Sequence, residues 1–314
     1  MKRSLISLLL VVAAAGVLPA SAATLNTAAN SVIPAETQQI ISVDYRKMND
    51  APSAVALKKR VLPDALKQFE QALRGVNIDT ATDVETLTFA AFKMKKEGLR
   101  VVGIAQGNFS RAKVLRKLKA KKVKGEKYRN ATLYPMVSGL EMTFLDDNTL
   151  LFGDQTALQK ALDTRDGETP GLSGNTQISN LVANVDQATV WSVLDTAGTQ
   201  HMLRQALGDA SKLADYETMK KRIQGSYYTA DFDRGVAFDL TVMTSDSLTA
   251  GTLSSVIRAG MLYRKMSASS GAEKLALEST QVESDSDKLK LHFKADDKRF
   301  QSLLSSDLFA AVSR

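Results

Sequence analysis

The spacing of apolar residues predicts alternating strands and helices in the first half of the chain. Residues 57–73 carry apolar side chains at three- and four-residue intervals, typical of one helical face, and Pro63 is expected to kink or restart that helix. Ser110 and Asp154 are placed to cap two further helices. Short apolar runs, several alternating with polar residues, predict strands at residues 39–43, 87–92, 99–105, 140–144 and 149–152.

The second half repeats this order of elements. Its apolar pattern predicts a first strand at 189–193 and helices at 200–223, at 247–263 and after Asp296 or Asp297. Hairpins are expected at 227–232 with 236–242 and at 275–282 with 289–293. Their turns contain Gly235 and the acidic stretch 285–287, residue types that favour turns.

Three landmarks recur in the two halves at nearly one offset. The pairs are Gly98 with Gly235 (137 residues apart), Phe152 with Phe293 (141) and Leu162 with Leu304 (142). We therefore expect an α+β fold made of two tandem ferredoxin-like-derived repeats, each of order βαββαββα, with antiparallel sheets and helices packed on one face. Phe152 should superpose on Phe293, and Asp154 should lie near Asp296. A shared order that arose by chance stays open as the alternative.

The domain boundaries follow from changes in composition. Residues 23–38 are small and polar and are expected to form an exposed lead-in. The first repeat then covers 39–165 and the second covers 179–314, and the stretch 166–178, rich in Gly, Pro and Thr, is expected to link them.

The first 22 residues have the pattern of a secretory signal peptide. Lys2 and Arg3 precede an apolar run, and Ala20-Ser21-Ala22 forms a small-x-small cleavage site before Ala23. An uncleaved anchor helix is the alternative, but the run is short for a span of about 20 residues. We expect an exported chain, periplasmic or extracellular after cleavage near Ala22-Ala23, with no transmembrane span in its mature part.

Composition narrows the chemistry further. The chain has 314 residues and no cysteine, which excludes disulfides, iron–sulfur clusters, thiol nucleophiles and lipid attachment through a lipobox cysteine. Without residues 1–22 it keeps 39 basic and 34 acidic residues, a net charge of +5. Because it has no cysteine for disulfides, the exported chain must be held together by packing.

Two short stretches carry a family resemblance. The chain resembles a group of uncharacterised exported bacterial proteins in two places. One is Ile33-Pro34-Ala35-Glu36-Thr37, before a strand that ends in Val43-Asp44, and the other is residues 145–154, LDDNTLLFGD. The resemblance implies an envelope location and a tandem α+β body. It implies no catalytic residues.

No familiar catalytic or metal-binding motif is present. The two histidines, His201 and His292, lie in different halves and lack zinc-ligand spacing. No nucleophile elbow, P-loop or dinucleotide fingerprint occurs, although a Ser–Lys arrangement stays open. Acidic groups at 146–148, 231–233 and 283–287 could bind calcium or pair as carboxylates, but each falls where a hairpin turn is predicted. No cofactor is expected.

One segment is strongly basic. Residues 111–129, here called the basic segment, hold ten cations and one acid, Glu126, and thus carry +9. Val114, Leu115 and Leu118 are expected to pack inward and leave a basic outer face. Its cations are Arg111, Lys113, Arg116, Lys117, Lys119, Lys121, Lys122, Lys124, Lys127 and Arg129.

The partners of the basic segment are expected among envelope polyanions. Phospholipid headgroups, lipopolysaccharide, an acidic polymer or an acidic protein would each fit. Nucleic acid is not expected, because Tyr128 and Tyr134 flank the segment and do not interleave regularly with the cations. A solvated basic face without a dedicated ligand is the alternative.

The sequence thus favours an exported, non-enzymatic binding or scaffold protein. A carrier of an apolar or lipid-like ligand, held in a pocket between helices and sheet, is the second hypothesis. An enzyme of unrecognised type is the third. A large apolar cavity would favour the carrier, and buried convergent polar groups would favour the enzyme.

Overall fold

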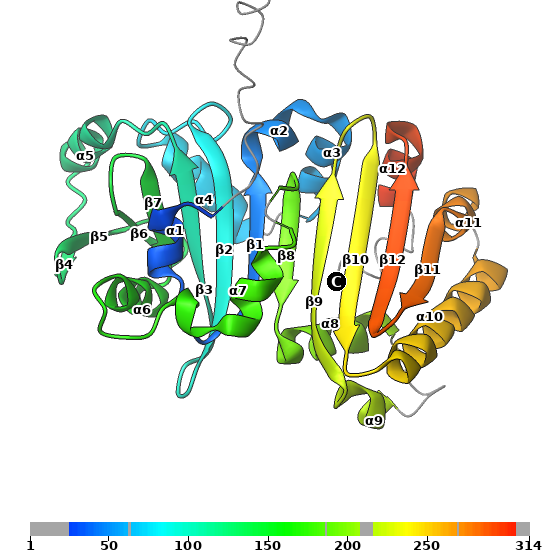
Figure 1. Cartoon of the computed structure of the whole chain (residues 1–314). Coiled ribbons are helices and arrows are strands. Elements are labelled where there is room, and N and C mark those ends of the chain that lie inside the picture. Colours follow the sequence, from blue (N-terminus) through cyan, green and yellow to red (C-terminus); the bar gives the residue numbers. More distant parts are fainter. Residues whose placement is uncertain (1–24, 62–63, 186, 208–215, 269, 306–314) are drawn as a thin grey trace, which may run out of the picture.

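The computed structural model describes residues 25–61, 64–185, 187–207, 216–268 and 270–305. It contains a 12-stranded sheet in which neighbouring strands run antiparallel, with helices packed against it (Figure 1). The predicted α+β class is confirmed. The first-half strands are β1 (Thr37–Asp44), β2 (Val84–Met94), β3 (Gly98–Gly107), β4 (Glu126–Tyr128), β5 (Ala131–Pro135), β6 (Glu141–Phe144) and β7 (Thr149–Gly153). The second-half strands are β8 (Val190–Leu194), β9 (Ile223–Asp231), β10 (Val236–Thr244), β11 (Thr280–Asp285) and β12 (Lys288–Ala295).

The two halves share this one sheet. The strand order is β11-β12-β10-β9-β8-β1-β2-β3-β7-β6-β5-β4, so β1 and β8 meet at the centre, where Ile40 faces Val193. The sequence predicted antiparallel sheets for the two repeats, and the structure joins them into one antiparallel sheet. The first strand of each half would otherwise present a free edge, and pairing the two edges satisfies both rows of backbone groups.

Helices lie on both faces of the sheet in the first half, not on one face as expected. One face, here called the α6 face, carries Ile40, Ile104 and Trp191 and is covered by α1 (Thr27–Val32), α6 (Gln155–Arg165) and α7 (Thr176–Val182). The opposite face, here called the α3 face, carries Phe152 and Val190. Its first-half helices are α2 (Tyr45–Asp50), α3 (Pro52–Val61), α4 (Asp64–Arg74) and α5 (Arg111–Ala120).

Apart from α7, which packs on β8 and β1 at the junction, the second half carries its sheet-packing helices on the α3 face. They are α8 (Thr196–Leu207), α9 (Tyr216–Lys220), α10 (Ser247–Ser267) and α12 (Asp297–Leu304). The helix α11 (Gly271–Glu278) lies between α10 and α12. Figure 1 shows β9, β10 and β12 with no helix in front of them, whereas α1 and α6 stand in front of the first half and α7 lies at the junction of β1 and β8.

The lead-in is not exposed, as was expected, but is part of the core. Asn26 caps α1 by accepting a hydrogen bond from Ala29 N at 2.8 Å, and Ala29, Val32 and Ile33 are fully buried on the α6 face. The stretch 166–178, predicted as a linker, contains a 3-10 turn (Leu172–Gly174) and the start of α7. The side chain of Leu172 is buried there beside α1.

Several element boundaries differ from the prediction. The helix expected at 57–73 forms as α3 and α4, and Pro63 lies outside the described residues. Residues 275–278 belong to α11 rather than to a strand. Ile223, predicted as the end of a helix, is the first residue of β9. The strands β4 and β5 were not predicted. Ser110 occupies the N-cap position of α5, but its side chain makes no capping hydrogen bond.

The order of strands is the same in both halves. The first half reads β1-β2-β3-β7-β6 and the second reads β8-β9-β10-β12-β11, with β4 and β5 as an addition to the first. Duplication is compatible with this order, and the superposition of Phe152 on Phe293 stays a prediction. Both rings lie on the α3 face, and Asp154 and Asp296 each cap the helix that follows.

The two halves differ by one residue in the spacing between the strand phenylalanine and the aspartate that caps the next helix. Asp154 comes two residues after Phe152, whereas Asp296 comes three residues after Phe293. Because side chains alternate between the faces of a strand, a change of one residue reverses the side on which the chain leaves. Accordingly α6 packs on the α6 face and α12 packs on the α3 face.

The signal peptide predicted for residues 1–22, with its cleavage site at Ala22-Ala23, lies outside the described residues. Among the helices that the structure does describe, none combines the length and the apolar character that a membrane crossing requires.

Gly103 provides a test of the packing on the α3 face. A Cβ atom at Gly103 would lie 2.1 Å from Cζ of Phe152, whose ring packs edge-to-face on Phe89 with centroids 5.8 Å apart. We expect Gly103→Ala to lower the free energy of unfolding by about 2 kcal/mol, because the ring must move to make room. Urea denaturation measures this change.

Gly271→Ala is the matched control for this substitution. Nothing lies within 4 Å of a Cβ atom at Gly271, so its replacement should change the free energy of unfolding by about 0.5 kcal/mol or less. Equal stability of the two variants would contradict the packing described for Phe152.

Candidate anion-binding surface

The helix α5 carries the first half of the basic segment. Val114 and Leu118 are buried on one side of it, in a cluster that includes the edge-to-face ring pair of Phe109 and Phe144 at 6.5 Å. Residues three and four apart share a helical face, so the cations at 113, 116 and 117 fall on the opposite side. This packing holds the basic face outward on a fixed support.

The chain leaves α5 through a left-handed residue. Lys122 has φ of 56°, and the amide of Val123 donates to the carbonyl of Leu118 at 3.0 Å while the amide of Lys122 donates to Lys119. These bonds form a Schellman-type end, at which glycine is the usual residue. The basic run then continues to β4, which pairs with β5 at the end of the sheet.

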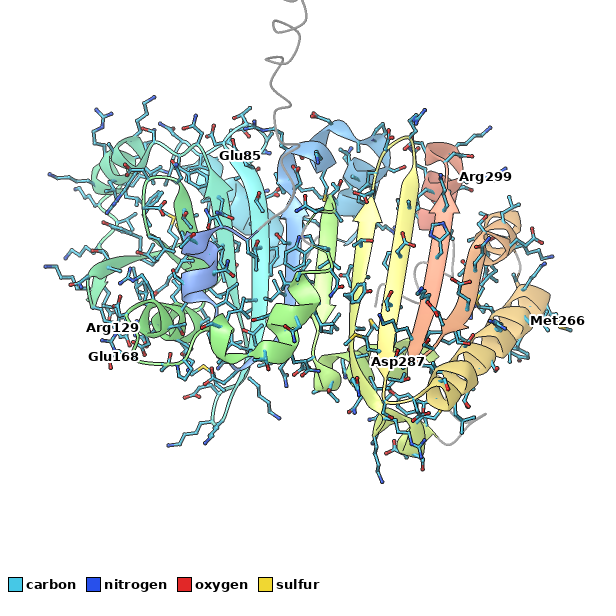
Figure 2. The ribbon with its side chains drawn as sticks, viewed as in Figure 1. Glu85, Arg129, Glu168, Met266, Asp287 and Arg299 are labelled. Atoms are coloured by element: carbon cyan, nitrogen blue, oxygen red, sulfur yellow. The ribbon has the colours of Figure 1, made fainter. Side chains whose placement is uncertain are left out.

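All ten cations of the basic segment are exposed to solvent, and nine form no ion pair with a described acidic side chain. The exception is Arg129. Its guanidinium lies 2.5 Å from Asp163 Oδ1, near the C-terminal end of α6, and 3.2 Å from Glu168 Oε1. Figure 2 shows Arg129 and Glu168 side by side below this helix. The structure thus places the predicted residues along one edge of the molecule. Arg129 differs from the other nine because it is paired with Asp163 of α6.

The environment of Arg129 also shifts two pKa values. The hydrogen bond to Asp163 raises the pKa of the Arg129 guanidinium above its ordinary value. Burial, followed by the hydrogen bond that its hydroxyl donates to Asp163 at 2.8 Å, raises the pKa of Tyr128. Through their bonds to Asp163, Tyr128 and Arg129 link the end of β4 to α6.

The remaining candidates from the sequence do not assemble into a catalytic or metal site. His201 lies on α8, whereas His292 on β12 contacts Asp239 at 2.7 Å. The acidic turns serve local structure, as when Asp146 Oδ1 accepts the amide of Asn148 at 2.8 Å. Within the described ranges, no three side chains of ligand type are grouped so as to hold a metal ion.

An apolar cavity of about 150 Å³ lies under α2, α3 and α4 on the α3 face. Its floor includes Leu87, Phe89 and Phe152, and its rim carries a polar group of three residues. There Lys58 Nζ lies 2.8 Å from Glu70 Oε1, and Tyr45 contacts both of them. The sequence suggested a pocket between helices and sheet but not these residues, because they come together only through folding.

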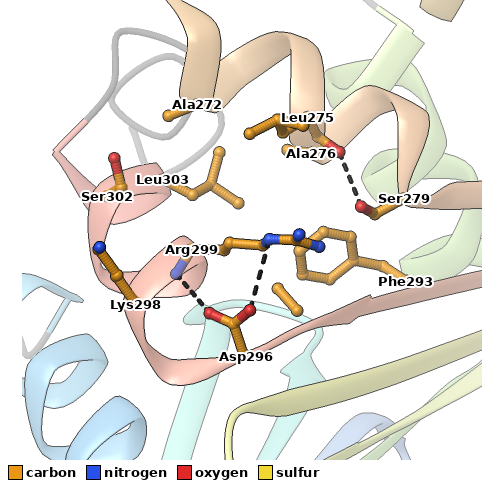
Figure 3. A pocket seen from close by; sticks show the side chains of 11 residues that line it. Ala272, Leu275, Ala276, Ser279, Phe293, Asp296, Lys298, Arg299, Ser302 and Leu303 are labelled. Atoms are coloured by element: carbon orange, nitrogen blue, oxygen red, sulfur yellow. Dashed lines mark hydrogen bonds and ion pairs between the residues drawn. The ribbon is translucent and has the colours of Figure 1, made fainter.

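A second hollow, of about 340 Å³, opens between α11, α12 and β12 (Figure 3). The Asp296 carboxylate accepts a hydrogen bond from the amide of Arg299 at 2.9 Å and lies 3.4 Å from the Arg299 guanidinium. This carboxylate therefore serves as the N-cap of α12. Its lining mixes apolar side chains with Lys298 and Arg299 and forms no group of convergent polar side chains.

Comparisons with known proteins support the fold alone. No family model matches the chain, and no curated protein matches it either. Crystal form III of TP0453 is similar in structure, with a TM-score of 0.51 at 9% sequence identity over 88% of this chain and 98% of that chain. Crystal form I of TP0453 gives a TM-score of 0.48 at 8% identity, over 88% and 96% of the two chains. The first likeness shows a shared α+β architecture.

Arg129 should act on stability rather than on binding. We expect Arg129→Gln to lower the midpoint of thermal unfolding, because Asp163 and Glu168 lose their cation. Arg116→Gln removes the same charge from a side chain with no ion-pair partner among the described residues and should leave the midpoint unchanged. Differential scanning calorimetry compares the two, and equal midpoints would contradict the anchoring role of Arg129.

Proposed function

We propose that the protein is exported and, without catalysing a reaction, binds an anionic surface of the bacterial envelope through the basic segment. The observation that carries this proposal is the set of nine exposed cations on α5, the following loop and β4 that lack a described acidic partner. The signal-peptide pattern of residues 1–22 supports export, where phospholipid headgroups, lipopolysaccharide and acidic polymers are the available polyanions.

The distribution of charge supports this location of the binding surface. The basic segment carries +9, whereas the rest of the chain after residue 22 carries −4, so the excess positive charge is local. Each Lys or Arg held near an anionic bilayer contributes about 1 kcal/mol, and several acting together give measurable binding. Because α5 is fixed by Val114 and Leu118, its cations meet a surface without first having to be ordered.

A five-residue variant tests the proposal. Co-sedimentation of residues 23–314 with vesicles of phosphatidylglycerol should show binding that fades between 0.1 M and 1 M salt, as the Debye length falls from about 10 Å to about 3 Å. We expect the combined replacement of Arg116, Lys117, Lys121, Lys122 and Lys124 by Gln to abolish binding. The fold should be retained, because Val114 and Leu118 are untouched.

The matched control removes five exposed cations elsewhere. Replacing Lys93, Lys95, Lys96, Lys274 and Lys294 by Gln changes the net charge equally but leaves the basic segment intact. This control should still sediment with phosphatidylglycerol and not with phosphatidylcholine. If both variants lost binding to phosphatidylglycerol equally, net charge and not the basic segment would explain the binding. Equal binding of the parent chain to phosphatidylglycerol and phosphatidylcholine would refute an anionic target.

A second function is favoured by the cavity under α2, α3 and α4. We propose that it binds a small uncharged amphiphile whose apolar part fills the cavity and whose hydroxyl group reaches the rim. A cavity of this volume lined by apolar side chains is of the size that holds a benzene ring. At the rim Lys58 and Glu70 neutralise each other, so a charged ligand group would lack a free counter-ion.

Two probes of equal length test the cavity. We expect 1-hexanol to shift the NMR signals of the Leu57 and Leu87 methyl groups, and hexanoate to leave them unchanged. Ala105→Leu should fill the cavity and prevent the shift, because Ala105 lines its floor. A stronger response to hexanoate would contradict the proposed ligand class, and an unchanged response in Ala105→Leu would place the binding elsewhere.

A further inference from the structure

The helix α10 lies at the edge of the molecule beyond β11, and its outer side exposes large apolar residues. Leu248, Leu262, Tyr263 and Met266 have relative exposures of 73%, 61%, 74% and 81%, and Figure 2 shows Met266 pointing away from the body. The inner side is buried through Ala250 and Leu253. Large apolar side chains exposed along one side of a helix point to an interaction surface.

Small residues fill the middle of the same side. Gly251, Ser255 and Ala259 follow one another at intervals of four residues, and nothing lies within 4 Å of a Cβ atom at Gly251. The outer side is therefore low in the middle and raised at both ends, with Leu248 at one end and Leu262, Tyr263 and Met266 at the other.

The charges of α10 are already used within the chain. Arg258 donates to the carbonyl of Val282 at 2.8 Å, and the other two cations pair with α11: Arg264 with Glu273 at 2.9 Å and Lys265 with Glu278 at 2.8 Å. Helices that lie on anionic membranes hold Lys and Arg free beside their apolar side. Two of the three cations of α10 are paired with acidic side chains and the third is bonded to a backbone carbonyl, which favours a protein surface over an anionic membrane as the partner.

We propose that α10 packs against α10 of a second copy of this chain, antiparallel and related by a twofold axis between Ser255 and Ala259. In this arrangement Tyr263 lies over the partner's Gly251, and Met266 packs against the partner's Leu248. Ser255 and Ala259 meet the partner's Ala259 and Ser255 at the centre, where small side chains permit close approach. The outer side of α10 is thus complementary to itself, as an isologous contact requires.

The size of the contact sets its strength. From Leu248 to Met266 the helix rises by about 27 Å. One helix pair of this length is a small contact beside the area of about 1,200 Å² that stable complexes bury, so we expect a weak dimer that forms as the protein concentration rises. This self-association goes beyond the proposed envelope binding and uses none of the cations of the basic segment.

Sedimentation equilibrium over a wide concentration range tests the dimer. The parent chain, residues 23–314, should shift from the mass of one chain toward two as its concentration rises. Ala259→Arg places a bulky cation beside the twofold axis and should raise the dissociation constant by about tenfold or more. Ala81→Arg makes the same change at an exposed turn of the first half and should leave the constant unchanged.

Cysteine pairing tests the antiparallel direction, since the chain has no cysteine of its own. Leu248→Cys and Met266→Cys chains, each oxidised alone, should stay uncrosslinked, and a mixture of the two should form a disulfide-linked dimer. Cross-linking of either variant alone to the same extent would overturn the antiparallel arrangement.

A membrane as the alternative occupant of α10 has a separate signature. If the parent chain stays monomeric throughout, and Ala259→Arg instead lowers binding to neutral phosphatidylcholine vesicles, the proposed dimer is wrong. Binding to phosphatidylglycerol through the basic segment would be unaffected by that result, so the two proposals fail independently.

Discussion

The pairing of β1 with β8 is the contact on which the rest of the fold depends. It places Ile40 opposite Val193 and Ile41 opposite Ser192, and so decides which side chains of both strands face the same way. Trp191, the one tryptophan of the chain, is fully buried beside this pairing on the α6 face. A slip of one residue would move every side chain of one half to the opposite face, so the apolar pattern on both sides of the junction fixes the register.

The junction also lets each half complete the core of the other. Because the sheet is continuous, α3 of the first half reaches α12 of the second, and Ala54 shares a cluster with Phe300 and Leu304. Ser53 donates a hydrogen bond to Asp297 at 2.5 Å across the same contact. On the other face, α1 and α7 pack around the central strands with a bridge between Pro34 and Gly171 close by. The two halves are thus similar in strand order but not separable in packing.

Local signals in the sequence account for what could be predicted. The cap of α6 at Asp154 and the inward side of α5 at Val114 and Leu118 depend on neighbours within four residues, and both are as expected. The burial of Val32 and the joining of β1 to β8 depend on residues more than 100 positions away, which a single sequence does not reveal. The exposure of the basic segment followed from its helical period. The capture of Arg129 by Asp163 did not, because the partner lies on α6.

The open α6 face of the second half has a consequence for the substitutions each half tolerates. In β7 all five residues are buried, since helices cover both faces, and the strand is apolar at nearly every position. In β12 apolar positions such as Leu289 and Leu291 alternate with Lys290 and His292, which face solvent. Every second site of β12 is therefore free to change its chemistry without disturbing the core. The corresponding strands β7 and β12 therefore differ: nearly every position of β7 is constrained by packing, whereas half of the positions of β12 can vary.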